Sequence, residues 1–509
     1  MKKMEADVIV VAAGMSGLAA ATQAAEKGAS VIAFEKSGTT GGAANMGMAF
    51  FAVESKYQKE QMYNWTRDDA FAFFMEYTHW RADAKLVRRW FNMSASTVDW
   101  VEKMGVEFLG AMKYFENSNI TQHMIKMPGS NRPTERCASV MIKKMTDYAV
   151  ELGVDFQFHT SVTKLLKGDK GQIVGVMARD ENGEEIEALA NSVIVATGGF
   201  GNNTKMIEQF LGFKWGEDMF TFRIPGIDGE GMRMVWDVGG KRSNINMEVT
   251  YNTPGTTDIF KTLSETMRQP NLMVNLDGKR FINEAIMNNT TYTGNALLQQ
   301  KHRCGFTIIG SDILDAYRKS GLDYITYHHG IRTLDKWDEE RDAYLSGRQI
   351  AETGLAALHE NLEDVAEAQH NFWECSSIEE IAQVTGIDLE NLKKTIARYN
   401  SMAGAYDQDF AKPAKYMRAI TGEKYYVARH FPSGYGSLGG IQVNENMEVL
   451  DEALDPIPGL YACGTDSASV FGDSYCFYNP GSTMSYAINS GRIAGMECVD
   501  YMDSDRFVE

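Results

Sequence analysis

The pattern of hydrophobic positions at the start of the chain predicts a βαβ unit over residues 7–36. The apolar run at 7–11 is typical of a buried parallel strand, and a second run at 30–34 has the same character. Between them, an alanine-rich segment from Leu18 to Lys27 predicts a helix. The pattern therefore predicts an α/β domain in which the strand-to-helix turn is a candidate ligand site.

Further along the chain, the pattern changes twice. Short strands are predicted between 155 and 196 and again from 439, and a helix over about 483–501 closes the chain. The intervening segment is mixed and polar, with helices expected near 345–370 and 376–402. We therefore predict a dinucleotide-binding domain from residues 1–245 and 434–509, with a second domain inserted at 246–433.

Composition and charge narrow the possible partners. The 509 residues are 44% apolar and 23% charged, which is typical of globular chains. A net charge of −18 disfavours contact with nucleic acid and with anionic membrane surfaces. The longest apolar runs have the length of strands and are too short to span a bilayer. We expect neither nucleic acid nor membrane insertion.

The cysteines give no sign of a metal centre or a haem. All six are scattered along the sequence, without a CxxC pair or zinc-ligand spacing. We interpret them as reduced thiols and expect no metal. The basic and apolar N-terminus continues directly into a glycine-containing turn, so we interpret it as a strand and not as a signal peptide. A cytoplasmic location follows from these two interpretations.

The turn after the first strand matches a dinucleotide-binding fingerprint except at its start, where Ala12 replaces the first glycine. Gly14 allows the backbone to approach a pyrophosphate, and Gly17 allows the helix to pack closely on the strand. The helix N-terminus adds free N–H groups and a partial positive charge. Glu35, at the end of the second strand, is placed to accept hydrogen bonds from ribose hydroxyls.

A second glycine-rich loop, at 38–42, follows the acidic residue directly, and this suits FAD better than NAD. With this loop, the chain resembles the FAD-dependent fumarate reductase and succinate dehydrogenase flavoprotein family. Motifs along the whole chain carry the resemblance, in the order 196–200, 229–231, 278–284, 458–464 and 490–495. The resemblance implies an α/β Rossmann-like FAD-binding domain with an inserted α+β capping domain.

The resemblance also implies which residues contact FAD. They are Ala12, Ala13, Gly14, Met15, Ser16, Gly17, Glu35, Lys36, Thr40, Gly41, Gly42, Ala43, Ala44, Met46, Thr197, Gly198, Glu230, Asp466, Ser482, Thr483 and Met484. Relatives that hold FAD covalently use a histidine in the loop after the ribose-binding acid. No histidine lies between Glu35 and Phe51, so we expect non-covalent FAD.

The family's substrate-binding cations are missing from this sequence. Glu248 and Gly436 stand where the dicarboxylate-binding members have histidines, and Asn288 stands where they have the proton-donating arginine. Their substrate arginine is replaced by Tyr478. Two carboxylates removed from water need paired cations, so we do not expect dicarboxylate reduction.

Tyrosines replace these cations. Tyr478, Tyr292 and Tyr114 lie where the 3-ketosteroid dehydrogenase branch of the family has active-site tyrosines, and Tyr475 is a rival to Tyr478 because a three-residue shift exchanges them. Forming or reducing a C=C bond next to a carbonyl develops negative charge on the oxygen, which a tyrosine O–H can stabilise. A second tyrosine can exchange the proton on carbon.

The main hypothesis is an FAD-dependent oxidoreductase acting on CH–CH groups, an ene-reductase or dehydrogenase of an enone-type substrate. One alternative is an acrylate reductase of the fumarate or urocanate type. An alternative of another class is an electron-transfer or scaffold flavoprotein. The sequence shows no second dinucleotide fingerprint and no spacing for an iron–sulfur cluster or haem, so the electron donor or acceptor is unidentified.

Overall fold

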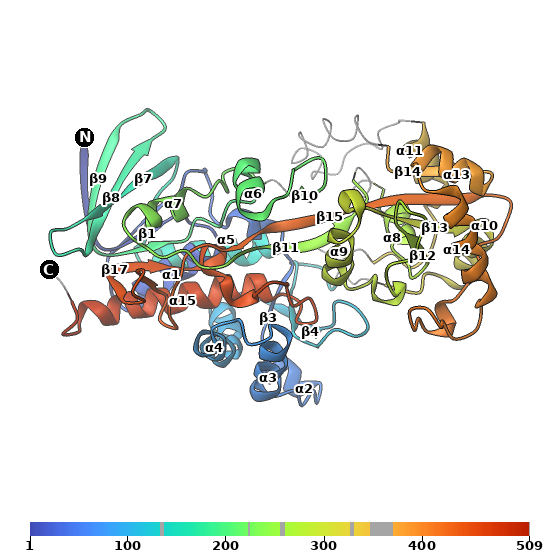
Figure 1. Cartoon of the computed structure of the whole chain (residues 1–509). Coiled ribbons are helices and arrows are strands. Elements are labelled where there is room, and N and C mark those ends of the chain that lie inside the picture. Colours follow the sequence, from blue (N-terminus) through green and yellow to red (C-terminus); the bar gives the residue numbers. More distant parts are fainter. Residues whose placement is uncertain (133–136, 222–223, 255–259, 326–329, 347–369, 508–509) are drawn as a thin grey trace. The chain divides into compact units, whose positions relative to one another are not determined.

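A computed structural model of the chain describes residues 1–132, 137–221, 224–254, 260–325, 330–346 and 370–507 (Figure 1). The chain divides into two compact units. Unit 1 comprises Met1–Gly212, Arg223–Glu248 and Gly436–Glu509, and unit 2 comprises Phe213–Phe222 and Val249–Tyr435. The segment 213–222 thus joins the second unit, outside the range at which the sequence places an insertion. The division of the chain into an FAD-binding and a capping domain stays a prediction.

Unit 1 is built on a largely parallel sheet with β1 (Lys2–Val11) at its centre. On one side β1 pairs in parallel with β2 (Val31–Phe34), which pairs with β6 (Asp155–Gln157). On the other side it pairs in parallel with β9 (Glu185–Val195), which pairs with β17 (Pro456–Ala462). Antiparallel strands extend this sheet: β7 (Thr160–Lys167), β8 (Ile173–Asp180) and β16 (Glu448–Leu450). This arrangement confirms the predicted α/β class.

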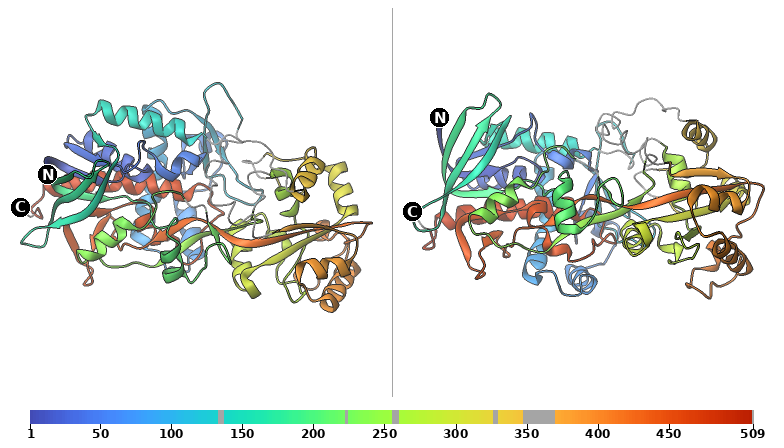
Figure 2. Two further views of the ribbon diagram at one scale, coloured as in Figure 1. Left: turned by 90° about the horizontal axis from the view of Figure 1, so that it is seen from above. Right: turned by 45° about the horizontal axis from the view of Figure 1, so that its top comes forward.

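Two helices, α1 (Met15–Glu26) and α15 (Ser482–Met502), pack together in unit 1 at very close range. A Cβ atom on Gly491 or Gly495 would overlap backbone oxygens of α1, so these glycines permit the contact. The blue start of the chain and the red C-terminal helix stay adjacent in both views of Figure 2. The other helices of the unit are α2 (Lys56–Glu60), α3 (Arg67–Tyr77), α4 (Ala84–Lys103), α5 (Ala138–Glu151), α6 (Thr204–Leu211) and α7 (Glu230–Asp237).

A small antiparallel sheet of unit 1 carries residues next to the candidate site. Its strands are β3 (Ala49–Phe51), β5 (Gln122–Ile125) and β4 (Phe108–Met112). Phe51 N–H donates to the carbonyl of Gly481 over 3.0 Å, so β3 is tied to the residue that precedes α15.

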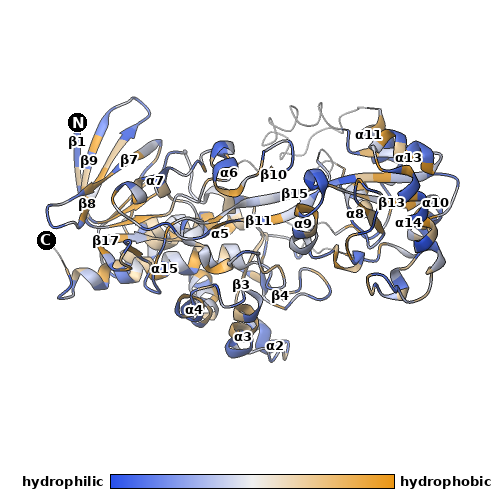
Figure 3. Ribbon diagram, viewed as in Figure 1, coloured by the Kyte–Doolittle hydropathy of each residue, from blue (hydrophilic) through white to orange (hydrophobic). Residues whose placement is uncertain are grey.

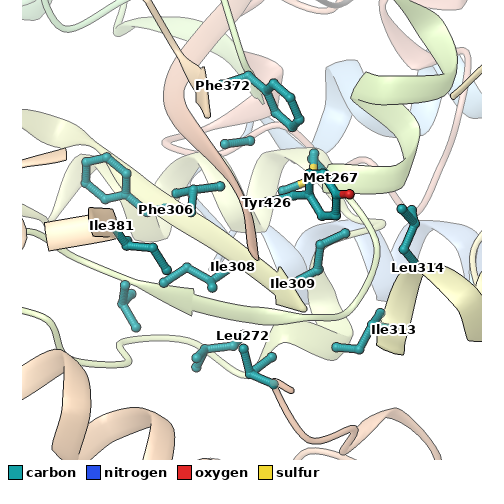
Figure 4. Close-up of a cluster of buried hydrophobic side chains, with 14 of the residues drawn as sticks. Met267, Leu272, Phe306, Ile308, Ile309, Ile313, Leu314, Phe372, Ile381 and Tyr426 are labelled. Atoms are coloured by element: carbon teal, nitrogen blue, oxygen red, sulfur yellow. The ribbon is translucent and has the colours of Figure 1, made fainter. Parts of the chain in front are cut away.

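Unit 2 contains a second, mixed sheet with its own core. Its strands are β10 (Phe220–Thr221), β11 (Ile245–Asn252), β12 (Leu272–Val274), β13 (Gly305–Gly310), β14 (Phe372–Cys375) and β15 (Tyr425–Gly439). Buried side chains such as Leu272, Phe306 and Ile308 form the core, as Figure 4 shows. The boundaries between the two units fall within β11 and β15.

The helices of unit 2 are α8 (Lys261–Met267), α9 (Thr290–Leu298), α10 (Ser311–Ser320), α11 (Trp337–Leu345), α13 (Ile378–Thr385) and α14 (Leu389–Ser401). Hydrophilic and hydrophobic residues are interleaved along α13 and α14 (Figure 3), as expected for helices with one buried face. The helix expected near 376–402 is therefore two helices. Most of the helix expected near 345–370 lies outside the described residues.

A buried network of charges in unit 2 gives one family motif a structural role. Arg280 binds Glu284 and Asp407 at 2.7 and 2.8 Å, and Lys412 lies 3.4 Å from Glu284. The Arg280 guanidinium holds the pKa of Asp407 at about 2, below its usual range. Two cations thus balance two carboxylates, and removing one partner from such a network typically costs about 3–5 kcal/mol. The motif at 278–284 therefore stabilises the fold of this unit.

Candidate functional site

The first strand-to-helix turn has the geometry that dinucleotide binding requires. Ala12 adopts a positive φ of 76°, the left-handed conformation that glycine takes more easily, as its position in the motif implies. A Cβ atom on Gly17 would overlap the carbonyl oxygen of Ala12, so helix and strand touch here. A Cβ atom on Gly14 would meet only one backbone oxygen, 4.0 Å away. Gly14 thus leaves space at the start of α1.

The N-terminus of α1 is available to an anion. Within the described part of the chain, no side chain caps this helix, and its first turn holds no acidic residue. Its first N–H groups have no partner within the helix, and the helix dipole is positive at this end. A phosphate group beside Gly14 would satisfy both features.

Glu35 links this turn to the loop that follows β2. Its carboxylate accepts hydrogen bonds from the backbone N–H of Ala13 at 2.9 Å and of Ser37 at 2.8 Å. An ionised carboxylate has about four acceptor positions, so both oxygens can still accept from ribose hydroxyls. Glu35 therefore orders the turn and can still bind the ribose hydroxyls, as the sequence predicts.

The second glycine-rich loop lies directly against the first turn. Gly41 and Gly14 form a parallel bridge, and Gly41 N–H donates to the carbonyl of Ala13 over 2.8 Å. Gly41 has a φ of 93°, which favours glycine, and a short 3-10 helix, η1 (Gly42–Met46), follows it. The hydroxyl groups of Thr40 and Thr146 are hydrogen-bonded to each other at 2.7 Å. The two glycine turns thus form one continuous backbone surface.

Three other predicted contact residues use their side chains within the protein. Asp466 accepts hydrogen bonds from the backbone N–H groups of Thr197, Gly198 and Gly199 at 2.5, 3.2 and 2.8 Å, and burial raises its pKa. It therefore shapes the turn after β9. Lys36 and Glu230 form an ion pair at 2.6 Å on the surface.

The start of α15 closes on the same loop. A Cβ atom on Gly47 would overlap the methyl group of Met484. Asn479 Nδ2 is buried and, among the described residues, has no hydrogen-bond partner. A buried polar atom without a partner is costly, and a bound polar group would satisfy it. Together with the space beside Gly14 and the uncapped helix, this atom fits a ligand that has a pyrophosphate and a polar ring, such as FAD.

Two of the candidate tyrosines meet in one aromatic cluster of unit 1. Tyr114 packs edge-on against Phe477 with ring centroids 5.0 Å apart, and Tyr478 lies 5.7 Å from Phe115. Phe115 and Phe477 are stacked at 5.7 Å. Tyr292 lies in unit 2, in the first turn of α9, where its backbone N–H binds Asn289.

Tyr475, the rival of Tyr478, is the tyrosine whose hydroxyl reaches the start of α15. Its oxygen accepts the backbone N–H of Thr483 over 3.3 Å, and the carboxyl group of Glu248 lies beside its hydroxyl. Burial raises the pKa of Glu248 to about 7. From the sequence, Glu248 is expected only to repel anions. Its contact with Tyr475 could not be predicted, because the two residues lie more than 200 positions apart.

The described residues offer neither a membrane span nor a metal site. Among them, no helix is both long and apolar enough to cross a bilayer. Nor do their His, Cys, Asp and Glu side chains gather in a group of three that could hold a metal ion.

Comparisons with known proteins agree with this geometry. The chain is 29% identical to a vinyl phenol reductase of Lactiplantibacillus plantarum, over 99% of this chain and 98% of that protein. It is 25% identical to a fumarate reductase (cytochrome) of Shewanella frigidimarina, over 97% of this chain and 77% of that protein.

Among solved structures, a 3-ketosteroid-Δ4-(5α)-dehydrogenase from Rhodococcus jostii RHA1 has the same fold. Its TM-score is 0.73 at 23% identity, over 98% of this chain and 97% of that one. A family model described as an FAD binding domain matches residues 7–481. The expected cofactor, FAD, and the expected class, an oxidoreductase acting on CH–CH groups, are confirmed. The chain belongs to this FAD-binding family of flavoproteins.

Proposed function

We propose that this protein moves hydrogen to or from a C=C bond conjugated to a carbonyl or another oxygen-bearing group of a neutral, hydrophobic molecule. The observation that carries this proposal is the composition of the site in unit 1. Tyr114, Tyr475 and Tyr478 gather among phenylalanine rings, with a carboxylate beside them where dicarboxylate reductases need cations. Relatives named vinyl phenol reductase and urocanate reductase support the reaction type.

The residues implied by the family resemblance hold FAD in this proposal. The turn at 12–17 and α1 would bind the pyrophosphate, Glu35 the ribose, and the loop at 40–46 with the start of α15 the rest of the cofactor. FAD, when bound, supplies or accepts the hydride. Tyr478 exchanges the proton on carbon, and Tyr114 stabilises the substrate oxygen. A role for Tyr292, which belongs to unit 2, stays a prediction from the sequence.

The alternatives receive less support. An acrylate reductase of the urocanate type must bind a carboxylate, which the Glu248 carboxylate would repel. A purely structural or electron-transfer role leaves the contact between the buried Tyr475 and the half-buried Glu248 without a purpose. We keep a cytoplasmic location and a separate, unidentified electron donor or acceptor as parts of the proposal.

One experiment tests the proposed function directly. The bound flavin is reduced anaerobically, and enones, vinyl phenols and acrylates are then screened for their ability to reoxidise it. Rapid reoxidation by a neutral conjugated compound is the expected result. If no compound with a C=C bond reoxidises the flavin, the proposal fails.

We expect the FAD to be released when the protein is denatured. No histidine stands in the loop after Glu35, so the sequence offers no residue for the family's histidyl bond. Acid precipitation followed by absorption spectroscopy of the supernatant checks this. Flavin that remained in the protein pellet would contradict non-covalent binding.

We expect fumarate to reoxidise the reduced flavin at least about a hundredfold more slowly than a neutral enone or vinyl phenol. Two carboxylates lose their hydration in the site and meet Glu248 in place of cations, a penalty of several kcal/mol. Stopped-flow absorbance of the flavin measures both rates. Comparable rates would mean that the residues at 248, 288, 436 and 478 have been assigned wrongly.

A further inference from the structure

Tyr475 lies between the N-terminus of α15 and Glu248. The backbone N–H of Thr483 donates to the Tyr475 oxygen over 3.3 Å. With its oxygen accepting that bond, the hydroxyl proton of Tyr475 is free to point to the Glu248 carboxyl group, which lies beside it. The N-terminus of α15 therefore orients the Tyr475 hydroxyl toward a carboxylate that can accept from it.

The surroundings of Glu248 make it a base that works near neutral pH. The groups that face it are Tyr475, from the loop before α15, and Thr483, from α15 itself. Among the described residues, no charged side chain shifts its pKa, which burial raises to about 7. The pKa of Tyr475 is raised well above 10 by burial and by Glu248, so the tyrosine stays protonated. Glu248 is the member of the pair that gains and loses a proton.

Tyr475 adjoins a cluster of aromatic side chains. Phe477 packs 6.2 Å from the ring of Tyr475, and Tyr114 and Phe115 pack on Phe477 at 5.0 and 5.7 Å. Stacked and edge-on contacts of this kind favour a planar ring. A proton acceptor, Glu248, near these aromatic side chains suits a molecule that has an acidic O–H group on an aromatic ring.

We propose that Glu248 and Tyr475 bind the hydroxyl of a phenolic substrate and that Glu248 takes its proton while hydrogen is added across a C=C bond conjugated to the ring. This inference rests on the proposed function and adds its substrate class and its base. A substrate ketone needs hydrogen-bond donors, which a carboxylate cannot supply, and a substrate carboxylate would be repelled by Glu248. A phenol, in contrast, donates a hydrogen bond that the Glu248 carboxylate can accept.

The chemistry balances for a para-vinyl phenol. As Glu248 removes the phenolic proton, electron density moves through the ring to the terminal carbon of the vinyl group, which takes a proton from Tyr478. FAD, when bound and reduced, would supply the hydride that the benzylic carbon needs, and the phenol recovers its proton from Glu248. One C=C bond becomes a single bond, with one hydride and one proton added. The vinyl phenol reductase among the relatives is named for a substrate of this class.

The test compares 4-vinylphenol with 4-methoxystyrene, which has the same ring and vinyl group but no acidic proton. With the wild-type holoenzyme we expect the phenol to reoxidise the dithionite-reduced flavin at least about 10²-fold faster, the usual contribution of a general base. Because the reaction needs ionised Glu248, the rate should fall below pH 7, about tenfold per pH unit. Equal rates for the two compounds would overturn the inference.

Glu248→Gln keeps the size of the side chain and removes the base. We expect it to abolish the preference for the phenol and the pH dependence, with FAD content unchanged. In a second measurement, 4-ethylphenol should perturb the flavin spectrum of the oxidised wild type at lower concentration than 4-ethylanisole does, and the variant should not distinguish them. Wild-type protein that binds both equally would refute the inference even if the variant fails to fold. Reoxidation by enones with no preference for the phenol would leave the proposed function standing and reject only this inference.

Discussion

Gly14→Val should yield a folded protein without FAD. The structure leaves space beside Gly14 at the start of α1. A valine side chain would occupy this space and block the position of the pyrophosphate. Losing that contact and the helix-terminal N–H bonds should weaken FAD binding at least about a thousandfold, or about 4 kcal/mol. The ratio of flavin to protein absorbance in the purified variant, with a thermal melt as evidence of folding, measures the effect.

Two further substitutions show whether the effect is local. Gly28→Asn, just after the other end of α1, adds a side chain where no atom lies within 4 Å, and asparagine tolerates the positive φ of 92° at this position. That variant should retain FAD. Gly17→Val should instead impair folding, because its side chain would overlap the backbone of Ala12. A yellow Gly14→Val protein would remove the assignment of this turn to the pyrophosphate.

The geometry of the first turn could be predicted because local sequence determines it. The left-handed conformation of Ala12 and the tight contact at Gly17 follow from a motif of six residues that has few ways to fold between a buried strand and a helix. The parallel sheet followed from apolar runs of strand length at 7–11 and 30–34.

Contacts between distant residues could not be predicted in the same way. Asp466 was assigned to FAD from family resemblance alone, and the structure shows that its carboxylate is held by backbone N–H groups more than 260 positions away. The pairing of Glu248 with Tyr475 spans a similar distance. Neither contact leaves a periodic signal in the sequence, because each depends on how the sheet and α15 bring separate loops together.

Tyr478→Phe should lower turnover of the accepted substrate by about 10²- to 10⁴-fold, the usual contribution of one acid–base group. Phenylalanine keeps the ring, so the packing against Phe73 and Phe115 is preserved and only the hydroxyl is removed. FAD content and the melting temperature should stay unchanged. Single-turnover reoxidation of the reduced flavin, followed by stopped-flow absorbance, measures the loss in the chemical step.

Tyr475→Phe is the matched comparison, because the two tyrosines are three residues apart and their hydroxyls have different surroundings. The Tyr475 hydroxyl lowers the pKa of the Glu248 carboxyl group. Tyr475→Phe removes this hydroxyl, so the pKa of Glu248 should rise above about 7. The pH at which the rate with a phenol falls should then move upward, whereas Tyr478→Phe should lower the rate at every pH without moving this midpoint. If Tyr475→Phe removes the whole rate and Tyr478→Phe changes it only a few-fold, the proton donor is Tyr475. If neither substitution changes the rate more than a few-fold, the proton on carbon comes from a group other than these two tyrosines.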